Sequence, residues 1–338
     1  MKRFSRFQIL FWLLLLALLV LALRDIPLTD IWETLQGLDP LQLLLLALFN
    51  ILIFLLFSSR WWLILHAQGY RLPYLSLAGY RLSAFAISYF TPGTQFGGEP
   101  LQVYLLQNRH HIPGSSALTA VMLDKLFEIL ANFTFLIIGI LLIVSGGLFK
   151  GLMHVHTVLV ISALLSLPLG YLFALWAGRF PLTWLIAKLP ARTTNLAVVR
   201  RAAPLIVSTE RQIATLFHHK PLTILWVLFL SGFIWILLLT EYWLMLRFLG
   251  VQLNLSQTIC ALAAARIAFL TPLPGGIGAL EASQVIALQA LGLHPAMGIS
   301  VSLLIRARDL TLGGIGLWWA AALSRRRILE PLPAQAGD

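Results

Sequence analysis

Long apolar runs separated by short polar segments dominate the chain. Several of these runs approach or exceed the roughly 20 residues that a helix needs to cross a hydrocarbon core about 30 Å thick. The apolar runs are Phe7–Leu23, Leu41–Leu65, Ser116–Val144, Val155–Trp176, Leu222–Leu246 and Met297–Leu323. The pattern predicts an all-α polytopic membrane protein with about six transmembrane helices, in which residues 1–338 form a single membrane domain.

Composition supports membrane insertion. The chain is 59% hydrophobic and only 11% charged, and its mean hydropathy is +0.88, which is outside the range of soluble domains. The single cysteine, Cys260, excludes an internal disulfide and a thiolate metal cluster. We find no nucleotide-binding, redox or metalloprotease motif, so we expect neither a cofactor nor a metal.

The basic residues predict an orientation. Sixteen of the 24 Lys and Arg residues fall on one side of the predicted spans, three on the other, and five at membrane depth. The largest connecting loop, residues 179–220, carries seven of the basic residues and one acid, Glu210. The positive-inside rule makes this loop and both termini cytoplasmic, and it explains the net charge of +11 without nucleic acid as a partner. We therefore expect a multi-pass protein of the bacterial inner membrane.

A break rich in glycine and proline, "TPGTQFGGEP", follows the second predicted span. Its flanking apolar arms are Tyr74–Phe90 and Glu99–Arg109. Both arms could cross the membrane, or both could dip in and return as a re-entrant hairpin. The second arm has about 11 residues and reaches roughly 16 Å, about half of the hydrocarbon core, which favours the hairpin. Non-helical backbone at that depth must be buried by protein or face a watery cavity.

The break recurs in the second half of the chain, within Phe269–Leu291. Three residues of the first break are repeated 182 residues later, Pro92 as Pro274, Gly93 as Gly275 and Glu99 as Glu281. Each half then contains two spans, a hairpin and a charged span, with the first repeat at about 1–147 and the second at about 152–327. The first hairpin begins inside and the second outside, so the repeats are inverted, as in many secondary transporters.

The two hairpins supply the first candidate site residues. Glycines beside each helix start permit unusual φ angles and leave N–H groups that suit an anion. These glycines are Gly97, Gly98, Gly275, Gly276 and Gly278. Glu99 and Glu281 could bind a cation, accept a proton or pair with arginine. The alternative is that the glycines allow close packing and the two acids only cap helices.

Further ionisable residues fall at or near membrane depth. The basic ones are Arg81, Lys125, Arg266, Arg306 and Arg308, and the acidic ones include Asp124, Glu128 and Asp309. Helical spacing puts Asp124 and Glu128 on one face, and Arg306 and Asp309 on another. These charges could form a purely structural buried network. In the other interpretation, some arginines hold a lipid phosphate, which suits their planar bidentate donors.

Four stretches together resemble a known family. "YFTPGTQFGGEPLQVYLL", "ALTAVMLDKLFEIL", "LTPLPGGIGALEASQVIAL" and "LLIRARDLTLGGIG" are similar to the membrane domain of bacterial lysylphosphatidylglycerol synthases and of the related stand-alone flippase-like proteins. The resemblance implies an inner-membrane protein that moves a lipid between leaflets. The synthases continue into a soluble aminoacyl-transferase domain, whereas this chain ends at Asp338, so lysyl transfer is not implied.

We therefore expect transbilayer movement of an anionic phospholipid or a lipid-linked headgroup, with membrane lipids as partners and no enzymatic activity. One alternative is a secondary transporter of a small anion. Another is an intramembrane transferase that uses Glu99 or Glu281 as a general base. A lateral groove open to lipid would favour the first function, a closed aqueous vestibule the second, and product formation the third.

Overall fold

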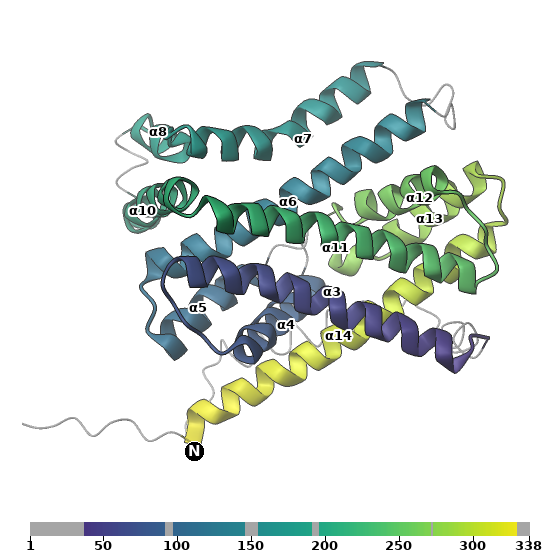
Figure 1. Ribbon diagram of the computed structural model, residues 1–338, viewed down its shortest axis with the longest axis horizontal. Coiled ribbons are helices and arrows are strands. Elements are labelled where there is room, and N and C mark those ends of the chain that lie inside the picture. The colour runs from purple at the N-terminus through teal and green to yellow at the C-terminus, as the bar shows by residue number, and fades with distance from the viewer. Residues whose placement is uncertain (1–36, 92–96, 146–154, 191–195, 272, 330–338) are drawn as a thin grey trace, which may run out of the picture.

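The computed structural model describes residues 37–91, 97–145, 155–190, 196–271 and 273–329, and these form helices and connecting turns without a strand (Figure 1). This confirms the predicted all-α polytopic fold. The first predicted span, Phe7–Leu23, lies outside the described residues, as do Pro92 and Gly93 of the first break.

Five long helices match the remaining predicted spans to within a few residues. They are α3 (Pro40–Ala67), α6 (Gly114–Ser145), α7 (Val155–Trp176), α11 (Pro221–Phe248) and α14 (Pro295–Leu329). In the described part of the chain, α3, α6 and α11 are long and apolar enough to cross a membrane on their own. The second half of α7, Ser166–Trp176, passes the same test together with α8 (Pro181–Ala187), although the chain bends by 89° between them.

Two pairs of shorter helices flank the two breaks; the first pair matches the predicted arms, whereas the first helix of the second pair lies before the predicted segment Phe269–Leu291. The first pair is α4 (Tyr74–Phe90) and α5 (Glu99–His110), and the second is α12 (Leu255–Ala268) and α13 (Ala279–Ala290). At 12 residues each, α5 and α13 extend about 18 Å, too short to cross the hydrocarbon core. A short 3₁₀ turn, Pro274–Gly276, precedes α13.

The helices of the two halves begin at equivalent places. α3 and α11 begin 181 residues apart, as do α4 and α12, and α6 and α14, while α5 and α13 begin 180 apart. Equivalent long helices run in opposite directions in Figure 1, as an inverted repeat requires. The offset of 182 from the motif therefore differs slightly from that of the helices, and Glu99 is the first residue of α5 while Glu281 is the third of α13. The repeat boundaries near 147 and 152 stay a prediction.

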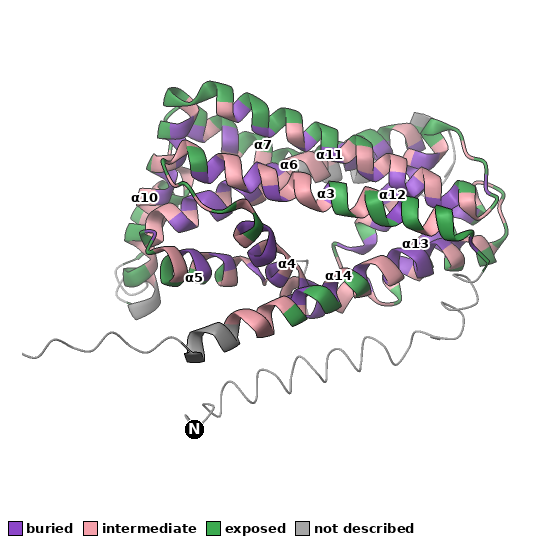
Figure 2. Ribbon diagram, turned by 60° about the horizontal axis from the view of Figure 1, so that its bottom comes forward, coloured by how far each residue is buried: buried purple, intermediate pink, exposed green. Residues whose placement is uncertain are grey.

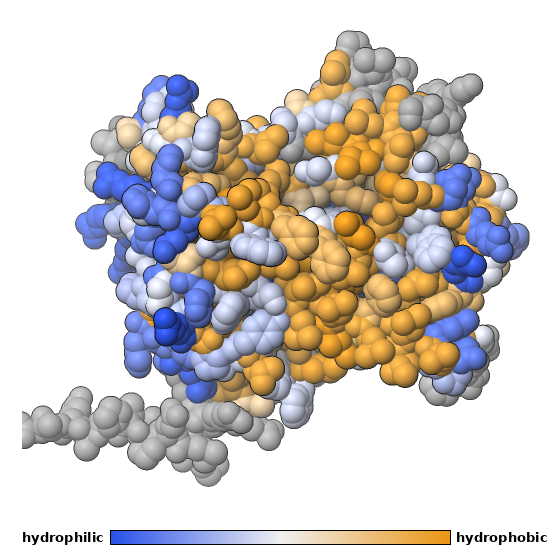
Figure 3. Space-filling view, in the orientation of Figure 1, coloured by the Kyte–Doolittle hydropathy of each residue, from blue (hydrophilic) through white to orange (hydrophobic). Residues whose placement is uncertain are grey.

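The halves are interleaved. The first helix of each hairpin packs on the charged span of the other half, α4 on α14 and α12 on α6, and α3 packs along α11. Buried residues gather where these helices meet, and exposed ones lie on the outer faces (Figure 2). Those outer faces are apolar, as at Leu44 of α3 and Phe229 of α11. Figure 3 shows a hydrophobic band with hydrophilic residues toward both ends, as expected for a protein that crosses a membrane.

The described part of the basic segment 179–220 is largely helical, although the sequence suggested a loop. It contains α8 and α10 (Ala197–His219). α10 packs on α6, α7, α8 and α11 because one of its faces is apolar, with Ile213 and Leu216 buried and Arg200 and Arg211 exposed on other faces. This amphipathic pattern is typical of a helix packed at the edge of a bundle.

Candidate functional site

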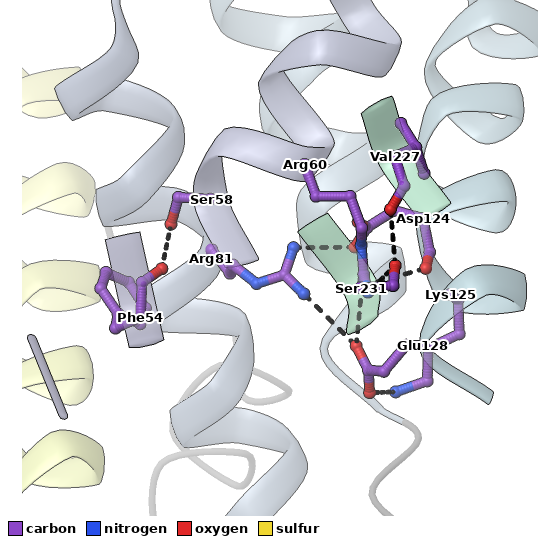
Figure 4. A network of polar contacts seen from close by, with 9 residues as sticks. All are labelled: Phe54, Ser58, Arg60, Arg81, Asp124, Lys125, Glu128, Val227 and Ser231. Carbon is purple, nitrogen blue, oxygen red and sulfur yellow. Dashed lines mark hydrogen bonds and ion pairs between the residues drawn. The ribbon is translucent and has the colours of Figure 1, made fainter. Parts of the chain in front are cut away.

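A buried charge cluster joins α3, α4 and α6 (Figure 4). Asp124 lies between two arginines, with Oδ1 2.7 Å from Nε of Arg60 and Oδ2 2.7 Å from Nη1 of Arg81. Both guanidinium groups also approach Glu128 Oε2, at 3.7 Å from Arg60 and 3.3 Å from Arg81. Asp124 is only 4% exposed and Arg60 only 1%. Such charges are tolerated in hydrocarbon because each has a partner of opposite sign.

The cluster continues to the first hairpin through Lys125. Its Nζ lies 2.9 Å from Glu128 Oε1 and 3.2 Å from Glu99 Oε1. The other oxygen of Glu99 accepts a hydrogen bond from the N–H of Gly97, and the N–H of Gly98 donates to Ser88 Oγ. The amides that we expected to bind an anion thus have partners within the protein. Glu99 pairs with the cation of Lys125 and accepts a hydrogen bond from Gly97, just before its helix, but it does not cap the helix start.

The second hairpin is held by Arg306. Its guanidinium pairs with both oxygens of Glu281 and donates to the carbonyls of Gly275, at 2.9 Å, and Gly276, at 3.1 Å. A positive φ at both glycines lets these carbonyls face the arginine. Tyr89 of the first hairpin accepts a longer bond of 3.4 Å from Arg306. Arg306 thus links the turn at Gly275 and Gly276 to Glu281 of the helix that follows it.

Arg308 forms a separate group with two acids. Its Nη1 lies 3.1 Å from Glu241 Oε2, and its Nε lies 2.8 Å from Asp309 Oδ1. Glu241 is 1% exposed and also accepts a hydrogen bond of 2.8 Å from Asn50 Nδ2. The i, i+3 spacing of Arg306 and Asp309 suggested a shared face, but Arg306 turns to the hairpin and Asp309 pairs with its neighbour.

Arg266 of α12 differs from the other membrane-depth cations. Among the residues that the structure describes, no carboxylate lies within salt-bridge distance of it, although each of the others has one. Its guanidinium carbon lies 5.0 Å from the ring centroid of Trp235, a cation–π arrangement. Arg308 pairs with two carboxylates, whereas Arg266 lies within salt-bridge distance of none in the described structure. The charge of Arg266 is therefore not neutralised by direct contact.

Arg266 lines a central cavity of about 270 Å³ between the two halves. One part of the wall is apolar and includes Phe57, Phe85, Trp235 and Phe269. The other part is charged and comprises Arg81, Lys125, Glu128, Arg266, Arg308 and Asp309. A smaller cavity of about 100 Å³ beside the first hairpin shares Arg81, Lys125 and Glu128 as lining residues. Together they offer space with both an apolar and a cationic side.

The structure brings most of the predicted site residues together, with exceptions. Asp124 lines only the smaller cavity, and the Glu281–Arg306 pair holds the second hairpin instead of lining the larger one. Gly278 takes a positive φ of 75° at the start of α13, which is a conformational role. Sequence reasoning missed Arg60, which lies within the predicted span Leu41–Leu65 but was not among the candidate residues. Its position seven residues before the end of α3 was the available signal.

The ion pairs in the described part of the chain all join residues of the same half. The polar side-chain contacts between the halves instead join a charged group of one half to a neutral group of the other. Arg60 donates to Ser231, Glu241 accepts from Asn50, and Arg306 donates to Tyr89. Arg109 donates to a main-chain carbonyl of α14. The first two contacts are symmetry-equivalent because Asn50 and Ser231, like Arg60 and Glu241, lie 181 residues apart.

Comparisons with known proteins agree with this architecture. The family model described as "Lysylphosphatidylglycerol synthase TM region" matches residues 8–316. A UPF0104 membrane protein of Methanothermobacter thermautotrophicus is 22% identical over 303 residues, which cover 87% of this chain and 86% of the relative. The UPF0104 membrane protein MJ1595 of Methanocaldococcus jannaschii is 24% identical over 310 residues, 90% of each chain. No solved structure matches significantly. The chain therefore belongs to the family of the lysylphosphatidylglycerol synthase transmembrane region, as its sequence motifs predicted.

Proposed function

We propose that the protein moves an anionic phospholipid, or a lipid-linked headgroup, between the leaflets of the membrane. One observation carries the proposal. Arg266, which has no carboxylate partner among the described residues, lines a cavity shared by both repeats. A phosphate is the natural counterion for such a group, because its oxygens match the paired donors of a guanidinium.

The cavity wall suits a lipid better than a free ion. The aromatic side, including Phe57, Phe85 and Phe269, can contact glycerol and the first methylene groups, while the charged side receives the headgroup. A site for a small hydrated anion alone has no need of this apolar wall. The contrast favours lipid over the secondary transporter of small anions.

The contacts between the halves favour rocking of one repeat against the other. Separation there breaks the hydrogen bonds of Ser231, Asn50 and Tyr89 and the bond from Arg109 to a carbonyl of α14. Each is worth about 0.5–1.5 kcal/mol net, or about 1.5–3 kcal/mol with a charged partner. Removing one partner from a buried ion pair costs about 3–5 kcal/mol. Rocking that keeps every ion pair intact is therefore the less costly motion, and it could expose the cavity to each leaflet in turn.

The proposed function also implies a location and partners for the protein. It works as a transporter without covalent chemistry, with membrane lipids as its partners, in a cytoplasmic (inner) membrane with both termini inside. In the described part of the chain, no group of three His, Cys, Asp or Glu residues could hold a metal, and the mechanism needs only binding and conformational change.

Purified protein in liposomes tests the function. It should accelerate the flipping of a fluorescent anionic phospholipid, and Arg266→Gln should slow that flipping at least tenfold while the protein stays monodisperse. A tenfold loss corresponds to about 1.4 kcal/mol, close to the lower limit of about 1.5 kcal/mol for one hydrogen bond with a charged partner. Arg247→Gln is the matched control, because Arg247 also lies 5.0 Å from an indole centroid, that of Trp243, but does not line the cavity.

Substitutions in the hairpins provide a second test of the same function. Glu99→Gln and Glu281→Gln keep the side-chain shape but remove one charge from each hairpin, and either should slow flipping. If wild-type liposomes match empty ones for a panel of anionic lipids and lipid-linked phosphates, with and without a proton or sodium gradient, the lipid proposal fails. Uptake of a radiolabelled small anion in the same liposomes would then support the alternative.

A further inference from the structure

The short helix α8 is stabilised in an unusual way. None of its seven residues is buried, and its large apolar side chains are exposed, Trp184 by 59% and Leu185 by 54%. An isolated helix of this length is not stable in water. α8 packs on α10, but this packing leaves none of its residues buried.

A buried glutamate of α10 holds α8 in place. Glu210, 1% exposed, accepts hydrogen bonds of 2.9 Å from the N–H groups of Leu182 and Thr183. It also accepts bonds from the hydroxyls of Thr183, at 2.6 Å, and Tyr171, at 3.0 Å. These bonds satisfy free N–H groups at the start of α8. Glu210 therefore anchors the start of α8, while Trp184 and Leu185 remain exposed.

Because Glu210 is buried as a cap, the surface around α8 carries only positive charges among the described residues of 179–220. Within the described part of 179–220, the exposed basic residues are Arg179, Lys188, Arg200, Arg201, Arg211 and Lys220, while the one acid is buried. The ammonium of Lys188 lies 4.0 Å from the ring centroid of Trp184. Figure 3 shows hydrophilic residues gathered at this end of the molecule. The surface is thus both apolar and cationic.

The direction of α8 identifies a matching partner. The 89° bend turns α8 away from the second half of α7, so α8 lies along the membrane plane if that part of α7 runs along the membrane normal. Leu185 and Trp184 then face the boundary of headgroups and acyl chains, and the surrounding cations face lipid phosphates. We propose that α8 and the exposed basic face of α10 dock on anionic phospholipid headgroups of the adjacent leaflet. This interaction is separate from the central cavity and does not depend on lipid flipping.

Full-length protein in nanodiscs tests the docking surface. In a Cys260→Ala background, Leu185→Cys carries a polarity-sensitive fluorophore, and discs of zwitterionic lipid are compared with discs that also contain anionic phospholipid. We expect a blue shift and stronger quenching by headgroup-attached quenchers in the anionic discs, with the difference reduced by salt. The combined variant Lys188→Gln, Arg200→Gln and Arg211→Gln should abolish the difference.

Arg247→Gln is the control variant, because it removes a cation over an indole at the far end of α11; it should leave the difference intact. Equal emission and equal quenching by aqueous iodide in both lipids would overturn the proposal. Protection of the label only in discs that hold two copies would also overturn it, in favour of a second copy of the chain as the occupant. Neither readout requires transport activity, so docking and flipping can fail independently.

Discussion

The substitution Asp124→Asn should destabilise the protein severely while Glu99→Gln should not. Asp124 is 4% exposed and makes ion pairs of 2.7 Å with both Arg60 and Arg81. Without its charge, the one carboxylate left within reach of Arg60 is Glu128, at 3.7 Å, besides its hydrogen bonds to Ser231 and to the main-chain carbonyl of residue 124. The loss of one partner from a buried pair costs about 3–5 kcal/mol, a large share of a total stability of about 5–15 kcal/mol.

Glu99→Gln is the matching change, because it also replaces a carboxylate by an amide but at a more exposed position. Its side chain is 21% exposed, and Lys125 keeps Glu128 at 2.9 Å when the charge of Glu99 is removed. We expect a cost of about 1 kcal/mol, that of an ordinary hydrogen bond. Unfolding by a denaturing detergent, followed by far-ultraviolet circular dichroism, should separate the two variants clearly, and Glu99→Gln should remain available for transport assays.

A double variant that removes both members of the ion pair tests whether the unpaired arginine causes the loss of stability. Replacing Arg60 by Met together with Asp124 by Leu removes one charge of each sign and leaves Arg81 paired with Glu128 at 3.3 Å. Because apolar replacement of a whole buried pair is often neutral or stabilising, this double variant should recover most of the stability lost in Asp124→Asn. The reasoning is refuted if Asp124→Asn unfolds like the wild type, or if the double variant is no more stable than the single one.

Two further predictions concern packing and orientation. A Cβ at Gly98 would collide with a main-chain carbonyl of α4, so Gly98→Ala should separate the arms of the first hairpin and lower both stability and flipping. Gly170→Ala should leave both unchanged, because no atom lies within 4 Å of the added carbon. Thermal unfolding and the liposome assay measure the difference. In a Cys260→Ala background, a cysteine at Gln252 should react with an impermeant thiol reagent from outside and one at Thr215 only from inside, and the reverse result would contradict the predicted orientation.

The sequence was sufficient for the elements of the fold but not for the pairing of charges. Apolar runs as long as a membrane core predicted α3, α6, α7, α11 and α14, and the glycine-proline breaks predicted α4, α5 and α13, because both signals are local. Which arginine meets which acid depends on the helix that lies opposite. Arg306 and Asp309 share a spacing that suits a pair, yet Arg306 turns to Gly275 and Gly276.

Two other site properties have no local signal. Arg60 shares Asp124 with Arg81 only because α3 and α4 both lie against α6. The lack of a carboxylate beside Arg266 in the described structure is likewise a result of tertiary packing, since the basic and acidic residues at membrane depth are nearly equal in number. The segment 179–220 looked like a loop because its basic residues dominate its composition, although Ile213 and Leu216 recur on one helical face.

The confinement of ion pairs to single halves also bears on how the chain is made. The first half is synthesised first, and the partners of its Arg60, Arg81 and Lys125 are acids of the same half, Glu99, Asp124 and Glu128. Insertion of this half therefore need not leave an uncompensated charge waiting in the lipid for a partner still on the ribosome. Among the side-chain bonds described between the halves, what must wait are contacts of neutral groups such as Asn50 and Tyr89, whose exposure is far less costly than that of an ion.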